Sequence, residues 1–116
     1  MNPVQQPTGA GTGSGGIKRA SVEATASGST QVVAAVPGQK LRVVGAIVGP
    51  VSAAVATKFL SGATDITPAA QNAANGGWQC NFWPGYLCET AVGEALNVNL
   101  SANATVPVMV TYIEVD

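Results

Sequence analysis

The sequence predicts an all-β fold, an antiparallel β-sandwich of the jelly-roll or immunoglobulin-like kind, with an extended glycine-rich arm before it. Short segments rich in Val, Ile, Thr and Ala are separated by Gly, Pro, Asn and Asp turn signals about every eight to twelve residues. No stretch shows the hydrophobic period of a long amphipathic helix. A chain of 116 residues has room for one domain with one modest core.

The first predicted strand begins at Lys18. In residues 18–26 small apolar residues alternate with polar ones, which is the pattern of a strand with one buried face. Gly28 and Ser29 interrupt this pattern. Residues 31–36 (QVVAAV) then predict a second strand.

Residues 40–48 (KLRVVGAIV) are the most apolar predicted strand, so we expect them to be central in a sheet. They are joined to the preceding strand at Pro37 and Gly38, a pair that suits the centre of a type II turn. Gly49 and Pro50 end the strand, because proline cannot donate a hydrogen bond to a sheet.

The middle of the chain is less regular. Residues 54–60 (AVATKFL) predict a strand, and residues 61–65 predict a hairpin connection into Ile66 and Thr67. Residues 68–75 (PAAQNAAN) fit a helical turn or two that starts at the proline, and fit a turn-rich loop equally well.

Two strands close the chain. Residues 95–101 alternate strictly, so one face is expected to be buried and the other to carry asparagines. Residues 106–115 predict the last strand, with a proline near its start where a missing donor is tolerated. The expected inward residues of the first of these strands are Leu96, Val98 and Leu100.

The chain divides into an extended arm, residues 1–17, and a β-sandwich domain, residues 18–116. The arm is rich in glycine and proline and has no charged side chain before Lys18, so it cannot bury a core of its own. We expect another protein subunit to hold it. The residues expected to contact that partner are Val4, Gln5, Gln6 and Pro7.

The charge is sparse. Only 9% of the residues are charged and 47% are hydrophobic, whereas about a quarter of an ordinary domain is charged. We therefore expect much of the surface to face other protein, with self-association into a homo-oligomer. A net charge of −1 with five basic residues argues against nucleic acid as a partner. No apolar run approaches the ~20 residues that span a bilayer, so no membrane contact is expected.

The residue types also argue against catalysis. The chain has no histidine, which removes the usual general base and the commonest transition-metal ligand. Its six carboxylates lie on separate segments apart from the pair near the C-terminus. We therefore expect no enzyme activity, no catalytic residue, no metal site and no cofactor.

Cys80 and Cys88 flank the segment FWPGYL. A three-residue turn at 83–85 would place these two cysteines opposite each other in a hairpin, which would allow a cross-strand disulfide. The sequence favours two free, partly buried thiols instead, because proteins assembled in the cytoplasm usually keep their thiols reduced.

Four of the six aromatic residues gather in residues 78–86. Two interpretations stay open: the rings fill one end of the core, or some of them lie outside and bind a partner. Trp83 and Tyr86 flank the expected turn, so these two are the candidate partner-binding residues. Trp78 and Phe82 complete the cluster.

Residues 38–116 resemble small β-rich structural proteins of tailed bacteriophage virions. The resemblance is carried by three motifs: Phe59 to Gly62 as an F-x-S-G hairpin, Thr90 to Ser101 as a T-A-x-G-E-A-L turn and strand, and Val108 to Val115 around Tyr112 as a final V-x-x-x-Y-x-E-V strand. The segment WQCNFWPGYLC departs from that pattern, because it is richer in aromatic residues and cysteine.

The resemblance implies a capsid decoration or cement protein, or another accessory virion protein of head or tail. Its partners would be the major capsid protein and other virion proteins. It would be assembled in the host cytoplasm and would act on the capsid surface, where a trimer would suit a symmetry axis of the shell. The alternative is a tail or head-fibre module that binds a host-surface glycan through the aromatic hairpin tip, Trp83 and Tyr86.

Overall fold

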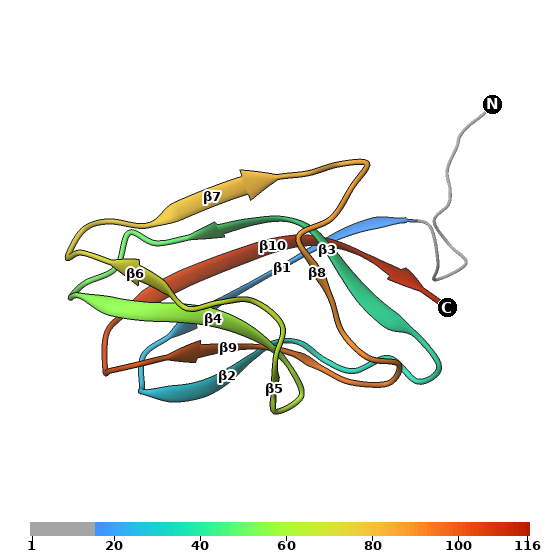
Figure 1. Ribbon diagram of the computed structural model, residues 1–116, viewed down its shortest axis with the longest axis horizontal. Coiled ribbons are helices and arrows are strands. Elements are labelled where there is room, and N and C mark those ends of the chain that lie inside the picture. The colour runs from blue at the N-terminus through green and yellow to red at the C-terminus, as the bar shows by residue number, and fades with distance from the viewer. Residues whose placement is uncertain (1–15) are drawn as a thin grey trace.

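Ten β-strands form two antiparallel sheets that pack face to face in the computed structural model, which describes residues 16–116 (Figure 1). The predicted β-sandwich is therefore confirmed. In the first sheet β1 (Ile17–Ala24), β10 (Val106–Val115), β3 (Lys40–Val48) and β7 (Trp78–Asn81) lie in that order, and β8 (Cys88–Glu89) also pairs with β3. In the second sheet the order is β2 (Gly28–Val33), β9 (Leu96–Leu100), β4 (Val55–Ser61) and β5 (Thr64–Asp65), and β6 (Ala70–Asn72) also pairs with β4.

The strand pairing decides between the jelly-roll and immunoglobulin-like alternatives. β5 and β6 share one edge of β4, and β7 and β8 share one edge of β3, so each pair acts as one interrupted strand. With these pairs merged, the first strand pairs with the last, the second with the next to last, and so on inward to the central hairpin. A hairpin of eight strands rolled into two sheets is the jelly roll.

The core lies between the sheets and is built from alternating strand residues. β9 shows the predicted alternation, because Leu96, Val98 and Leu100 are buried while the two asparagines between them are not. Phe59 is the largest fully buried side chain, and its ring meets that of Trp78 edge to face, 6.1 Å between centroids. Inward residues of β3 and β10 complete the core: Leu41, Val43, Ala46, Val48, Val106, Val108, Val110 and Tyr112.

Three connections differ from the sequence-based expectation. Residues 68–75, which fitted a helical turn and a loop equally well, contain β6, because Ala70–Asn72 pairs with the start of β4. The Pro37-Gly38 turn forms, with Gly38 at φ 74°, but it connects the two sheets rather than two paired strands. Gly28 (φ 96°) makes a turn and also begins β2, so the second strand starts earlier than residue 31.

A buried polar cluster ties β4 to β6 and β7. The Thr57 hydroxyl accepts hydrogen bonds from Asn72 Nδ2 and from Trp78 Nε1, both at 3.3 Å. Asn72 Nδ2 also donates to the carbonyl of Val55 at 3.1 Å. Buried donors need such partners, since an unpaired one costs the full desolvation of the group.

We expect Thr57→Val to lower the free energy of unfolding by about 1–2 kcal/mol, because the near-isosteric side chain leaves Trp78 Nε1 without its acceptor and removes one of the acceptors of Asn72 Nδ2. Urea denaturation measures the change. Thr64→Val is the matched control at an exposed position of β5, and it should change stability by less than about 0.5 kcal/mol. Equal effects at the two positions would show that the cluster contributes nothing.

Candidate functional site

The exposed aromatic residues lie on a loop between β7 and β8, residues 82–86, which we call the aromatic loop. Both of its ends are fixed to β3. The Phe82 N–H donates to the carbonyl of Val44 at 2.8 Å, and the Leu87 N–H donates to the carbonyl of Val43 at 2.7 Å. The loop therefore leaves the sheet edge beside Val44 and returns to it beside the neighbouring residue of β3, Val43.

A β-bulge explains why two neighbouring carbonyls point to the same edge. The partner of β10 jumps from Gly45 to Val43 between Thr111 and Tyr112, so Val44 is the extra residue. Successive carbonyls of a regular strand point to opposite edges, and a bulge interrupts that alternation. The irregularity in β3 thus positions both ends of the aromatic loop.

The hairpin that would place Cys80 opposite Cys88 does not form. Cys80 pairs with Ala46 and Cys88 pairs with Val43, so the two cysteines lie in line along β3 rather than across from each other. Both cysteines are free in this arrangement, with Cys80 half-buried and Cys88 buried. That the thiols stay reduced in the assembled protein remains a prediction. The physical reason is that β3 is long enough to pair with both β7 and β8, and these two short strands do not pair with each other.

Burial makes the Cys88 thiol a poor nucleophile. Desolvation, with a smaller contribution from the neighbouring Cys80, raises the pKa of Cys88 from its ordinary 9.0 to about 12. Burial also raises the pKa of Cys80, against the opposing effect of a backbone hydrogen bond at Ala46. Only the thiolate reacts, so both thiols are protected near neutral pH.

We expect iodoacetamide at pH 8 to modify Cys80 before Cys88 in the folded protein. A pKa of about 12 leaves roughly a thousandfold less thiolate at this pH than the ordinary value does. Intact-mass spectrometry should show one adduct on the native protein and two after denaturation in urea. In Cys80→Ser the native protein should stay unmodified; rapid alkylation of that variant would contradict the burial argument.

The aromatic cluster divides between core and surface. Trp78 is half-buried against Phe59, whereas Phe82, Trp83 and Tyr86 keep 48%, 52% and 49% of their surface exposed. The expectation that Trp83 and Tyr86 lie outside the core is confirmed. Their role in binding a partner stays a prediction.

Charged residues hold the aromatic loop against the sheet. The guanidinium of Arg42 lies over the Tyr86 ring, 4.6 Å from its centroid, and its Nε donates to Glu89 Oε2 at 2.7 Å. Lys40 Nζ is 3.6 Å from the other oxygen of Glu89. One face of Tyr86 is therefore covered, and Trp83 is the more available of the two rings. Ion pairs this exposed stabilise weakly, so their main effect is on the position of the ring.

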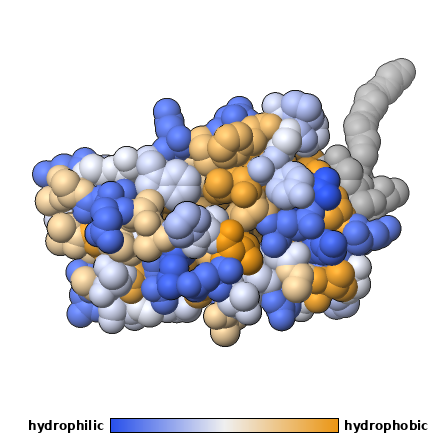
Figure 2. All heavy atoms as spheres, viewed as in Figure 1, coloured by the Kyte–Doolittle hydropathy of each residue, from blue (hydrophilic) through white to orange (hydrophobic). Residues whose placement is uncertain are grey.

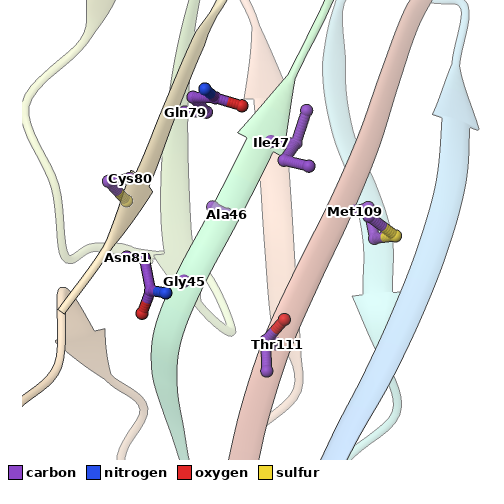
Figure 3. Close-up of a pocket in the computed structure, with 8 residues that line it drawn as sticks. All are labelled: Gly45, Ala46, Ile47, Gln79, Cys80, Asn81, Met109 and Thr111. Carbon is purple, nitrogen blue, oxygen red and sulfur yellow. The ribbon is translucent and has the colours of Figure 1, made fainter. Parts of the chain in front are cut away.

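Beside the loop, the outer face of the first sheet carries a shallow depression of about 450 Å³. Its floor is Gly45, which has no side chain, between Asn81 on β7 and Thr111 on β10. Figure 3 shows these side chains around Gly45, with Ile47 and Gln79 at the other end of the depression. We call this surface the Gly45 depression.

Apolar side chains remain exposed on several parts of the surface. Ile47 and Met109, which border the Gly45 depression, are 42% and 38% exposed. Figure 2 shows the side of the molecule on which β4, β6 and β7 are nearest the viewer. Hydrophobic residues gather near the middle of this side, and hydrophilic residues lie around them. Exposed apolar surface of this kind, next to exposed aromatic rings, is typical of protein interfaces.

The described residues bear on two further expectations, those about a metal site and a membrane span. Within residues 16–116 no group of three or more His, Cys, Asp or Glu side chains comes together in a way that could hold a metal ion. The same part of the chain has no helix of the length and hydropathy needed to cross a membrane. The predicted arm contacts Val4, Gln5, Gln6 and Pro7 lie outside the described residues.

Comparison of this chain with protein-family models, with curated proteins and with solved structures finds no match.

Proposed function

We propose that this protein is a structural component of a tailed-phage virion, a decoration or cement protein that binds the assembled head and stabilises it. The observation that carries the proposal is the aromatic loop, in which exposed Phe82, Trp83 and Tyr86 are held in a fixed place on the sheet edge. Rigid aromatic side chains dominate the binding energy of protein interfaces.

The fold supports the proposal by analogy. Jelly rolls recur in viral capsid domains, although a fold alone does not define a function. The sparse charge fits a protein that covers much of its surface with other subunits. A ligand that binds only the assembled lattice stabilises that lattice by mass action. The partners would be the major capsid protein and neighbouring virion proteins, with the capsid surface as the location.

Binding to purified capsids tests the proposal. Trp83→Ala should weaken capsid binding by about tenfold or more, and so lower occupancy at limiting protein concentration, because truncating an anchor that dominates an interface typically costs about 2 kcal/mol or more. Val92→Ala is the matched control, since Val92 is also exposed but lies on a different loop. Unchanged occupancy for Trp83→Ala would remove the aromatic loop from the interface.

The arm has its own test. A chain that lacks residues 1–16 should retain the sandwich, since all ten strands described in residues 16–116 begin after that point. If the arm reaches a neighbouring capsid subunit, occupancy should fall while the thermal unfolding of the free protein stays the same. Full occupancy by the truncated chain would show that the arm is not needed for binding to the capsid.

A second candidate function is binding of a host-surface glycan by a tail or head-fibre module. It is favoured by the exposed Trp83 ring next to Asn81, whose Oδ1 accepts a hydrogen bond from the Trp83 N–H at 3.1 Å, because sugars bind to aromatic faces with polar groups around them. Lectin domains also use the jelly roll. The double variant Trp83→Ala, Tyr86→Ala should then abolish adsorption to host cells and leave incorporation into virions intact. The opposite result favours decoration.

A further inference from the structure

β1 is the outermost strand of the first sheet, and one of its edges has no strand beside it within residues 16–116. It is eight residues long and pairs along its whole length with β10 on the other side. In Figure 1 it is the blue strand behind β10. The free edge of such a strand presents backbone N–H and C=O groups that can pair with another strand.

Two charged residues of β1 have no charged partner among the described residues. Of the five basic side chains, Lys18, Lys40, Arg42 and Lys58 each form an ion pair, and Arg19 does not. Glu23 also lacks any ion pair or side-chain hydrogen bond in this part of the chain, and both residues are exposed.

Arg19 and Glu23 lie on the same face of the sheet. Arg19 is opposite Thr111 and Glu23 is opposite Pro107, on the outward side that also carries Met109. Along an extended strand they are about 13 Å apart, which is too far for them to pair with each other. Opposite charges that are separated in this way within one strand can pair with the same strand of a second copy in antiparallel orientation.

One register satisfies both charges. If two copies of β1 run antiparallel with Ser21 opposite Ser21, then Arg19 of each copy lies directly opposite Glu23 of the other. The two-fold axis stands perpendicular to the sheet, so the outward faces of both copies stay on one side. Two cross-strand ion pairs form on that side.

The inward face fits the same register. Ala20 of each copy lies opposite Val22 of the other, and both side chains are only partly buried in the single chain. In a register shifted by two residues, Ser21 lies opposite either Arg19 or Glu23, and neither charged residue has an opposite charge across from it. A shift of four places Arg19 against Arg19 or Glu23 against Glu23, which is repulsive.

We propose that this protein forms a two-fold dimer in which β1 pairs with β1 of a second copy, Ser21 opposite Ser21, so that the two first sheets join into one continuous sheet. A second copy is the partner expected at this edge, because Arg19 and Glu23 of one copy pair with Glu23 and Arg19 of the other. The inference is independent of the proposed function, since it uses only the strand order and the unpaired charges.

Sedimentation equilibrium of the full chain should give the mass of a dimer. R19E alone should weaken self-association about tenfold or more, because both ion pairs become repulsive contacts between carboxylates. E23R alone should do the same. The double variant R19E/E23R restores opposite charges across the axis and should restore the dimer. Circular dichroism and the thermal midpoint of each variant show that the sandwich is folded.

A cysteine at the axis gives an independent readout. Ser21→Cys should form a covalent dimer under mild oxidation, because side chains directly opposite in an antiparallel pair have Cβ atoms about 4.5–5.5 Å apart. Gln79→Cys, at the opposite edge of the same sheet, is the control and should not cross-link at the same rate.

Several results would overturn the proposal. A monomer or a trimer for the full chain would do so, as would a dimer whose strength the charge reversals do not change. If the full chain is monomeric and a chain without residues 1–15 dimerises, then the N-terminal segment occupies the edge instead of a second copy.

Discussion

Replacing Phe59 by alanine is expected to lower the free energy of unfolding by about 3–5 kcal/mol, the range typical of removing a large ring from a packed core. Phe59 has none of its surface exposed and packs edge to face with Trp78. Removal of the ring leaves a cavity between the two sheets that rigid strands cannot close. The loss combines the transfer free energy of the ring with the cost of that cavity.

The backbone at Phe59 makes collapse of the site still harder. Its N–H donates to the Thr67 hydroxyl at 2.9 Å and its carbonyl accepts from the Ile66 N–H at 3.0 Å, so residues 66–67 hold one edge of β4 here, while β9 pairs with the other edge. Urea or guanidinium denaturation measures the loss. Phe82→Ala is the matched control, because the same ring is removed from an exposed position. A loss at Phe59 no larger than that at Phe82 would contradict the assignment of the core.

Gly77→Ala is expected to destabilise the fold by about 3 kcal/mol, at the upper end of the usual cost of overpacking. A Cβ at Gly77 would lie 2.2 Å from the carbonyl oxygen of Val48 and 3.0 Å from Cα of Gly49. Both neighbours are backbone atoms, so no side-chain rotation can relieve the overlap. The end of β3 and the start of β7 can approach this closely only because glycines face each other there.

Gly93→Ala separates this clash from the ordinary cost of replacing glycine. Gly93 has φ 75° and no atom within 4 Å of an added Cβ, so its substitution should cost only the roughly 1–2 kcal/mol of a left-handed backbone. Thermal unfolding followed by circular dichroism compares the two variants. If Gly93→Ala is the more destabilising, close approach of the two segments is not what requires glycine at 77.

Much of the sandwich could be predicted because its strands are local patterns. Residues 40–48 and 106–115 become β3 and β10 without change of bounds, since each is a continuous run of β-branched and apolar residues between turn signals. The strict alternation of residues 96–100 likewise gives β9 and its buried face. The exposed position of Trp83 followed from its neighbour Pro84 and from the glycine after it.

The remaining features depend on pairing between distant segments, which no local pattern contains. Residues 70–72 become a strand only because β4 offers them an edge, and Trp78–Asn81 and Cys88–Glu89 pair with β3 rather than with each other. One sequence signal of this arrangement was available: Gly45, in the middle of the most apolar strand. An interior glycine often marks a bulge or a close approach, and here it lies beside the bulge at Val44.

The independent attachment of β7 and β8 to β3 leaves the aromatic loop outside the part of the chain that folds the sandwich. Each short strand has its own ladder on β3, and the aromatic loop between them contributes no residue to the core. Substitutions or insertions within residues 82–86 therefore leave the register on either side unchanged, as is usual for exposed loops on a rigid scaffold. Natural variation can revise what the loop contacts while the jelly roll beneath it stays the same.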